Sequence, residues 1–223
     1  MINASTSTPN QPTTGLFLFT RFPQPGNTKT RLIPALGAVG AADLQKQMTV
    51  HLFSRFQKIC QQKDIQLQVH FAGGSLQQMK TWLGEHVLFV PQCEGNLGDR
   101  IIFSLKQGFS AQLETQREAQ LERIIVVGSD CPHIDCIHIT QTLSLLKNHD
   151  IVLGPATDGG YYLIGLKHLW LPLFNDVPWS THHLLERTLA IAEQMSLSVS
   201  LLEPLSDIDR PEDLSLWENI YHD

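Results

Sequence analysis

The chain alternates short apolar runs with longer segments in which apolar residues recur every three or four positions. The apolar runs are bounded by turn-forming or polar residues, so each predicts a strand. In the segment 64–74 the pattern alternates, and Gln66, Gln68 and His70 fall on one face. The predicted strands cover residues 15–20, 64–74, 86–92, 123–130, 150–156, 159–166 and 197–205.

The segments between these runs predict helices. Leu44, Met48, Leu52 and Phe56 form an i, i+4 ladder, which indicates a helix over about 40–61. Pro211 suits the first turn of a last helix over 210–220. Further helices are predicted at 75–83, around Ile101, Leu105, Phe109 and Leu113, around Ile139, Leu143 and Leu146, and at 182–195.

Strand and helix alternate almost throughout, and runs such as 124–127 are apolar without a break. Such strands need cover on both faces, so we predict an α/β fold with a mainly parallel sheet between two helix layers. No linker divides the chain, which predicts one domain over 15–223. Residues 1–14 are mostly small and polar and predict a disordered lead-in.

Composition narrows the choice of partners. The 223 residues are 42% apolar and 17% charged, with a net charge of −6 and no basic stripe, which argues against nucleic acid as the main partner. The sequence has no apolar run of membrane-spanning length and no charged-then-apolar signal segment. The four cysteines lack the density of a disulfide scaffold, so we expect free thiols and a cytoplasmic protein.

In parallel sheets the ligand crevice lies beyond the carboxyl ends of the strands, so the loops that leave the strands are the site candidates. In the first loop, Gly26 lets a ligand approach the backbone, Lys29 and Arg31 supply cations, and Thr28 and Thr30 supply hydroxyls. This composition can cradle a phosphate. It is not a Walker A loop, because Thr28 stands where that motif has Gly before the Lys. A solvated turn with two surface cations is the alternative.

Two acidic residues directly follow predicted strands. Asp130 is either a ligand for a divalent cation or the start of an Asx-turn. Asp158 precedes Gly159 and Gly160, so it belongs either to a site loop with Tyr161 or to a tight Asp-Gly hairpin turn. The hairpin and the site are compatible with each other.

The segment 206–214 carries Asp207 and Asp209. Asp209 stands where a helix cap is expected, and a carboxylate at a helix entrance can also reach a bound metal. 

A second metal hypothesis involves four zinc-type ligands in one short segment. Their spacing does not fit the common structural zinc sites, and Pro132 separates the first two. Cys131 also lacks a general base in the sequence, so packing is the better interpretation of its thiol. The four residues are Cys131, His133, Cys136 and His138.

Taken together and in order, the exit loops closely resemble an uncharacterised bacterial family of nucleotide-diphospho-sugar transferase-like proteins. That family is similar to the phospholactate guanylyltransferases and, more distantly, to molybdenum-cofactor guanylyltransferase. The resemblance runs from about residue 16 to 218 and is carried by the segments at 18–32, 92–101, 126–134, 156–166, 176–181 and 207–214.

The resemblance implies a GT-A-type fold, which is a Rossmann-like α/β/α sandwich. It implies a Mg²⁺- or Mn²⁺-dependent transferase that moves a sugar from a nucleotide donor to a small acceptor. A nucleotidyltransferase that releases pyrophosphate and a non-catalytic nucleotide-binding module stay open as alternatives. The partners are then a nucleotide or nucleotide sugar and a small molecule. A homodimer is compatible with the sequence, which does not settle the oligomeric state.

The resemblance also implies roles for individual residues. Catalysis falls to Lys29, Arg31, Asp130 and Asp158. Nucleotide binding falls to Arg21, Gly26, Lys29, Thr30, Arg31, Gly95, Asn96 and Gly98. Acceptor binding falls to Gly159, Gly160, Tyr161, Trp179, Ser180 and Thr181, and the metal to Asp130 and Asp209. The chain departs from the Asp-x-Asp pair of many GT-A enzymes, because Asp130 lies between Ser129 and Cys131, and His133 stands where relatives commonly carry an acid.

Overall fold

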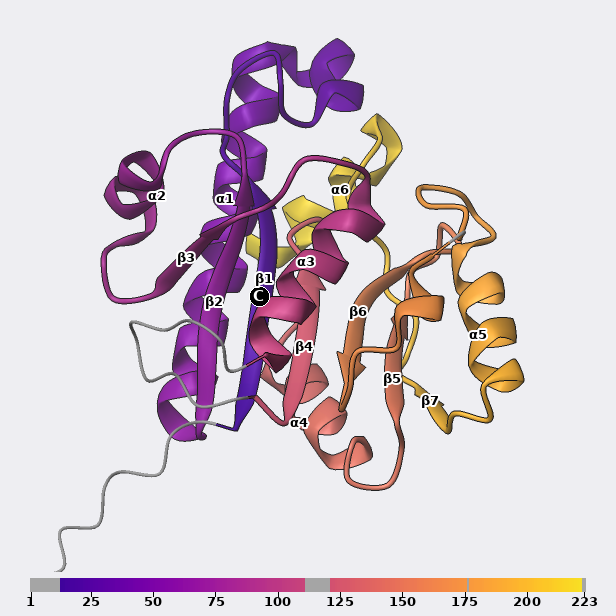
Figure 1. The fold of residues 1–223 in the computed structure, drawn as a ribbon. Coiled ribbons are helices and arrows are strands. Elements are labelled where there is room, and N and C mark those ends of the chain that lie inside the picture. Colours follow the sequence, from indigo (N-terminus) through magenta and orange to yellow (C-terminus); the bar gives the residue numbers. More distant parts are fainter. Residues whose placement is uncertain (1–12, 111–120, 176, 222–223) are drawn as a thin grey trace, which may run out of the picture.

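The computed structural model describes residues 13–110, 121–175 and 177–221. Its seven strands form one sheet in the order β3-β2-β1-β4-β6-β5-β7 (Figure 1). Among the strands of the described residues, only β6 runs antiparallel to its neighbours, β4 and β5, so the predicted mainly parallel sheet is confirmed. The strands are β1 (Thr14–Arg21), β2 (Ile65–Ala72), β3 (Leu88–Pro91), β4 (Arg123–Gly128), β5 (Ile151–Pro155), β6 (Tyr161–Leu166) and β7 (Val199–Leu201).

The helices occupy the segments that the sequence predicts, with differences at their ends. They are α1 (Ile33–Gln62), α2 (Leu76–Leu83), α3 (Leu97–Phe109), α4 (Cys136–Leu145), α5 (Leu184–Gln194) and α6 (Leu214–Glu218). The 3-10 turns are η1 (Thr30–Leu32), η2 (Leu171–Leu173), η3 (Pro211–Asp213) and η4 (Asn219–Tyr221). Within the described residues, none of the helices combines the length and hydrophobicity that crossing a membrane requires.

Several boundaries differ from the prediction, and the last strand keeps only Val199–Leu201 of the predicted 197–205. Helix α1 begins at Ile33 rather than near residue 40 and is interrupted at Gly37, whose φ of 70° a helix does not allow. The predicted last helix is instead the short α6 between two 3-10 turns. Strand β1 begins at Thr14, inside the predicted lead-in, most of which lies outside the described residues, as does Leu113.

The core has two sides because strand side chains alternate between the faces of the sheet. On β1, Leu16 and Leu18 belong to the apolar layer that α1, α2 and α4 cover. Phe17 and Phe19 point the other way and pack with residues of α3 and α5. In Figure 1, α3 lies in front of the sheet and α1 behind it. This arrangement is the three-layer sandwich that continuous apolar strands predict.

The polar face of β2 lies in the interior. Gln68 and His70 are buried, and the ring of His70 stacks on Phe19 with 5.2 Å between centroids. His70 Nε2 lies 3.1 Å from the Gln68 side-chain oxygen. Burial lowers the pKa of His70 to about 3, so the ring is neutral at physiological pH. Both faces of β2 are therefore covered despite the alternating sequence.

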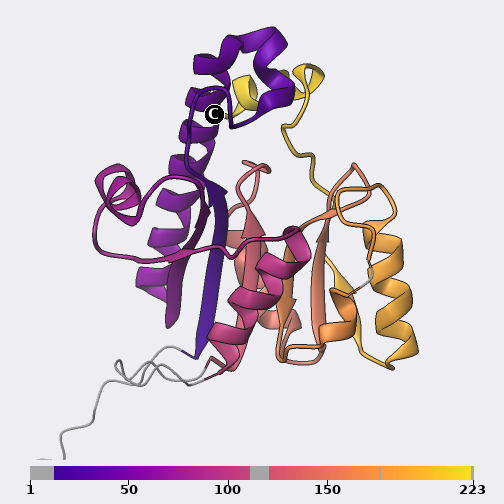
Figure 2. The same cartoon turned by 45° about the horizontal axis from the view of Figure 1, so that its top comes forward.

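A third, smaller apolar cluster joins the two ends of the fold. Leu32 directly precedes α1, and Met48 lies within it. Both side chains are fully buried and pack against Ile208 and Trp217 near the carboxyl terminus. Figure 2 shows the segment around α6 beside the start of α1. This packing holds residues after β1 next to residues 207–209, which lie far apart in the sequence.

Replacing Phe17 by Ala should lower the free energy of unfolding by about 3–5 kcal/mol, because a fully buried ring leaves a cavity between the sheet and α3. Phe103→Ala is the matched control: its side chain is 37% exposed, and we expect a loss of less than about 1 kcal/mol. Urea denaturation followed by circular dichroism measures both. Equal losses would contradict the assigned core.

Candidate active site

A cleft of about 550 Å³ opens where the order of the strands in the sheet reverses, between β1 and β4. From the central pair β1 and β4, the sheet extends to one edge through β2 and β3 and to the other through β6, β5 and β7. The exits of the two parallel strands β1 and β4 diverge at this point, which is where α/β sheets bind ligands. The cleft is lined by four cations, Arg21, Lys29, Arg31 and Arg100, and by two carboxylates, Asp130 and Asp209.

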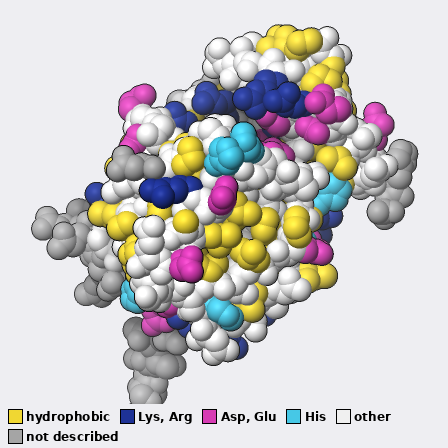
Figure 3. Space-filling model, turned by 90° about the vertical axis from the view of Figure 1, so that its right-hand side faces the viewer, with side chains coloured by type: hydrophobic (Ala, Val, Ile, Leu, Met, Phe, Trp, Pro, Cys, Tyr) yellow, Lys and Arg dark blue, Asp and Glu magenta, His cyan; other side chains and the backbone are white. Residues whose placement is uncertain are grey.

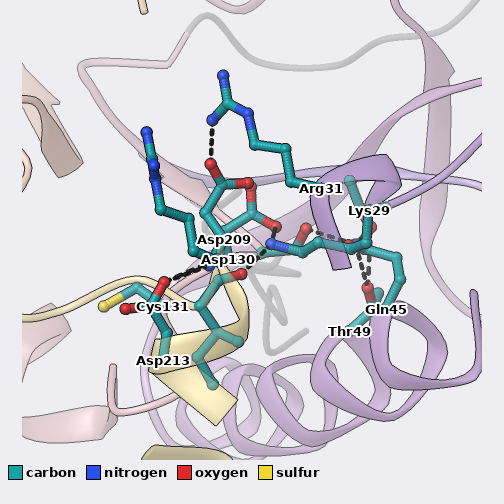
Figure 4. Close-up of polar contacts among 12 residues, drawn as sticks. Lys29, Arg31, Gln45, Thr49, Asp130, Cys131, Asp209 and Asp213 are labelled. Atoms are coloured by element: carbon teal, nitrogen blue, oxygen red, sulfur yellow. Dashed lines mark hydrogen bonds and ion pairs between the residues drawn. The ribbon is translucent and has the colours of Figure 1, made fainter. Parts of the chain in front are cut away.

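Lys29 lies at the centre of the cleft and joins the two exit loops. Its Nζ lies 2.8 Å from Asp130 Oδ1 and also donates a hydrogen bond to the backbone oxygen of Ile208 (Figure 4). The Lys29 side chain is only 4% exposed, whereas the Asp130 side chain is 54% exposed. The backbone of Lys29 has a φ of 50°, a left-handed conformation that costs energy for a residue with a side chain.

Arg31 forms a second ion pair, with Asp209. Figure 4 shows the Asp209 carboxylate turned toward the Arg31 guanidinium rather than toward the helix that follows it. The expected helix cap at Asp209 is therefore wrong. Asp213 reaches back instead and accepts hydrogen bonds from the backbone N–H groups of Asp209 and Arg210 at 3.0 and 2.8 Å.

Backbone contacts fasten the carboxyl-terminal segment to the loop after β4. The N–H of Ile208 donates to the oxygen of Asp130 at 2.8 Å. The thiol of Cys131 donates to the oxygen of Ser206 at 3.2 Å, and burial raises the pKa of this thiol above its usual range. The thiol therefore has the packing role that the sequence favoured over a nucleophilic one.

A buried polar network under the cleft was missed in the sequence analysis. Gln45 of α1 donates through Nε2 to the hydroxyls of Ser129 at 2.8 Å and of Thr20 and Thr49 at 3.2 Å each. It thereby joins α1 to the ends of β1 and β4, directly beside Asp130. The signal in the sequence is one amide beside the apolar ladder at Leu44, but the partners of Gln45 lie on other elements.

The segment 95–98 contributes to the cleft mainly through the residues beside it. Asn96 caps α3 by accepting from the N–H of Asp99 at 3.0 Å. Arg100, which the sequence analysis also missed, lines the cleft and donates through Nε to the oxygen of Gly95 at 3.1 Å. Gly26 is exposed with a φ of 82° and shapes the first loop without lining the cleft.

Gly98 is buried against Trp179 rather than open to the cleft. A Cβ at this position would lie 2.3 Å from Trp179 Nε1. Trp179 and Tyr161 line a small apolar pocket of about 90 Å³, which shares Phe19 and Leu97 with the main cleft. The structure thus brings together two of the residues predicted to bind the acceptor.

The predicted Asp-Gly hairpin turn joins β5 to β6. Asp158 Oδ1 accepts from the N–H of Gly160 at 2.8 Å, and Gly159 has a φ of 91°. A Cβ on Gly159 would lie 2.1 Å from the backbone oxygen of His182, so this turn packs against the loop of Ser180 and Thr181. These residues stand beside the cleft and do not line it.

Negative charge gathers at this edge of the sheet. Burial raises the pKa of Asp207, and the nearby carboxylates of Asp158, Asp130 and Asp209 raise it further. Within the described residues, no group of three or more His, Cys, Asp or Glu side chains lies close enough to hold a metal ion. Mg²⁺ is commonly held by one or two carboxylates together with substrate phosphates. Asp130 and its neighbours fit a metal that arrives with a phosphate ligand.

The side chains that the sequence offered as zinc ligands, within 131–138, serve instead in packing and in helix capping. Cys136 donates to the backbone oxygen of Arg55 at 3.5 Å. His138 Nδ1 lies 2.7 Å from Asp135 Oδ1, and this carboxylate accepts from the first N–H groups of α4. These contacts account for Cys136 and His138 without a metal, as the contact with Ser206 does for Cys131.

The fold and the cleft at the reversal of strand order define a protein of the GT-A-like transferase class, as the sequence analysis predicted. A profile of the family described as "Uncharacterized protein conserved in bacteria (DUF2064)" matches residues 55–181, more than half of the chain, and the chain belongs to this family. No curated protein matches the chain in sequence.

Solved structures show the same fold. A candidate nucleotide-diphospho-sugar transferase from Desulfovibrio desulfuricans G20 superposes with a TM-score of 0.79 at 26% identity, over 92% of this chain and 85% of that one. The 4-diphosphocytidyl-2C-methyl-D-erythritol synthase of Anaerococcus prevotii has a TM-score of 0.61 at 9% identity, over 94% and 98%. Glucosyl-3-phosphoglycerate synthase of Mycobacterium tuberculosis, solved with Mn²⁺ and UDP, has a TM-score of 0.57 at 8% identity, over 91% and 74%. The last two share the fold alone.

Gly98→Ala should lower the free energy of unfolding by about 1–3 kcal/mol, because the new methyl group collides with the Trp179 ring. Gly128→Ala, at the neighbouring cleft, is the matched control, since its Cβ would meet nothing within 4 Å. Chemical denaturation measures the difference. A Gly98→Ala protein as stable as the control would contradict the packing of Trp179.

Asp207→Asn should increase the free energy of unfolding at pH 7. The folded-state pKa of Asp207 is raised, so its ionised form destabilises the fold once the pH exceeds that pKa. Below the unfolded-state pKa the carboxyl is protonated in both states and the gain should vanish. Denaturation at pH 7 and pH 3 measures this, and a gain of the same size at both pH values would contradict it.

Proposed function

We propose that this chain is a metal-dependent transferase that moves a sugar from a nucleotide-diphosphate donor to a small acceptor in the cleft between the exits of β1 and β4. One observation carries the proposal: Lys29 and Arg31 after β1 lie directly opposite Asp130 and Asp209. Cations that can hold phosphates and carboxylates that can hold a metal therefore meet in one cleft.

Each residue has a role that follows from the charge of the leaving group. A nucleoside diphosphate gains negative charge as the bond to the sugar breaks. Lys29 and Arg31, with Arg21 and Arg100 in the same cleft, stabilise that charge from preorganised positions. Gly26, Thr30, Gly95, Asn96 and Gly98 shape the two loops that carry these side chains, and none of them supplies a charge.

The carboxylates provide the metal site. Asp130 and Asp209, with Asp207 close by, hold a Mg²⁺ or Mn²⁺ ion together with the donor phosphates. Such an ion supplies charge stabilisation at the phosphoryl oxygens. Before the ligands bind, Lys29 holds Asp130 in position through their ion pair, and Gln45 holds Ser129 beside it.

The acceptor binds beside the cleft, at the small apolar pocket that β6 lines. Tyr161 and Trp179 line the apolar pocket there. The turn of Asp158, Gly159 and Gly160 and the loop of Ser180 and Thr181 form its neighbouring rim. Asp158 is exposed at this rim and provides a carboxylate that can accept a proton from an acceptor hydroxyl.

Nucleotidyl transfer with release of pyrophosphate is the second candidate. The four cations in the cleft favour it, because a nucleoside triphosphate carries more charge than a diphosphate. CMP:2-keto-3-deoxy-manno-octonic acid synthetase, solved with CTP, shares the fold with a TM-score of 0.57. A nucleotide-binding module without catalysis is the alternative of another class.

A panel of nucleotide sugars and nucleoside triphosphates, titrated with and without Mn²⁺, tests the proposal. We expect metal-dependent binding of a nucleotide sugar and slow release of its sugar, and Asp130→Asn should slow that release by about 100-fold or more. Asp150→Asn is the control, because Asp150 is also paired with a lysine, Lys167, at 3.5 Å. Asp150 lies directly before β5, at the end of the strands opposite the cleft.

Pyrophosphate release from a triphosphate would favour nucleotidyl transfer. Binding that is indifferent to metal and brings no turnover would favour the non-catalytic module.

A further inference from the structure

Both carboxylates that line the cleft, Asp130 and Asp209, are already paired with cations. Lys29 is paired with Asp130, and Arg31 with Asp209 (Figure 4). Figure 3 likewise shows Lys and Arg side chains gathered beside Asp and Glu side chains near the top of one face, above a broad hydrophobic area. Resting on the function proposed above, we propose that the cleft binds a polyphosphate only as its chelate with a divalent cation.

The inner pair sets this requirement because its ammonium group is shielded from water, although the Asp130 side chain is 54% exposed. Lys29 is 4% exposed, and two acceptors hold its ammonium group: Asp130 Oδ1 and the oxygen of Ile208. A phosphate that reaches Lys29 without a metal meets the Asp130 carboxylate beside the same ammonium group. The two anions repel each other, and the loss of a partner for a buried charge is strongly unfavourable.

A divalent cation that arrives without phosphate is repelled by the positive charge of Lys29. At Asp130 it would stand beside the Lys29 ammonium group, which is 2.8 Å from the same carboxylate. A chelate brings both charges at once, so Asp130 exchanges Lys29 for the cation while Lys29 exchanges Asp130 for phosphate. Each ligand therefore raises the affinity for the other, which is positive coupling between two sites.

The loops cannot avoid the exchange by moving apart. Thr28, next to Lys29, is buried, and its hydroxyl donates to the oxygen of Phe22 at 3.1 Å. Leu32 and Ile208 are both fully buried in the third apolar cluster. The pair is thus held from both sides, and only a change of partners frees Lys29.

The outer pair has a smaller effect. The side chains of Arg31 and Asp209 are 61% and 33% exposed, and water screens a pair of that kind. Arg31 can therefore leave Asp209 for a phosphate at little cost. The two pairs predict different responses to the same aspartate-to-asparagine change.

Calorimetric titration with inorganic pyrophosphate, with and without Mg²⁺, tests the proposal without a choice of nucleotide base. Wild-type protein should bind pyrophosphate about tenfold more tightly with Mg²⁺ than without it. Asp130→Asn should bind metal-free pyrophosphate about tenfold more tightly than wild type, because Lys29 is released, and should no longer respond to Mg²⁺. Asp209→Asn should gain about twofold or less.

Two further variants complete the design. Lys29→Met should lose pyrophosphate binding under both conditions, and Asp150→Asn should match wild type, which shows that the gain does not come from a change in net charge. Circular dichroism of each variant verifies that it is folded.

Equal affinity of the wild type with and without Mg²⁺, or no gain of metal-free affinity in Asp130→Asn, would overturn the chelate requirement. If those results came with turnover of a nucleotide sugar, the proposed function would stand. Absence of pyrophosphate binding in every folded variant, with and without Mg²⁺, would overturn both.

Discussion

The parallel pairing of β1 with β4 is the constraint on which the site depends. The two strands stay in register from Thr14 opposite Arg123 to Phe19 opposite Gly128, so they end at the same level of the sheet. The loop after β1 carries Lys29, and the loop after β4 carries Asp130. Side chains far apart in sequence therefore meet at 2.8 Å without a contribution from any other domain.

The carboxyl-terminal segment closes the site and is held by apolar packing as well as by charge. Ile208 and Trp217 share the third cluster with Leu32 and Met48. That packing offsets the energetic cost of burying Asp207 near other carboxylates, and burial and these carboxylates both raise the pKa of Asp207. It also stabilises Lys29 in its strained backbone conformation. Strain and like charges concentrated at one edge are typical of sites selected for function rather than for stability.

Each of the two carboxylates that line the cleft is paired with a cation, and this pairing links recognition to mechanism. A site of unpaired cations would hold any phosphate, and a site of unpaired carboxylates would hold any divalent cation. Because the cations and carboxylates of the two pairs hold each other, a phosphate without metal and a metal without phosphate are both disfavoured. Specificity therefore comes from the ion-pair partner that each ligand must displace. The exposed outer pair leaves this discrimination mainly to Lys29 and Asp130.

The sequence by itself determined the elements, the fold class and the loops that form the cleft, because strand and helix periodicity and turn residues are local. Lys29, Arg31 and Asp130 could be predicted as site residues because they follow strands whose carboxyl ends lie at the same edge of the sheet. Only the tertiary structure decided which side chains meet there. It paired Lys29 with Asp130, brought Gln45 and Arg100 to the cleft, turned Gly98 toward Trp179 and buried the polar face of β2. These outcomes depend on contacts between residues distant in the chain, which no local pattern encodes.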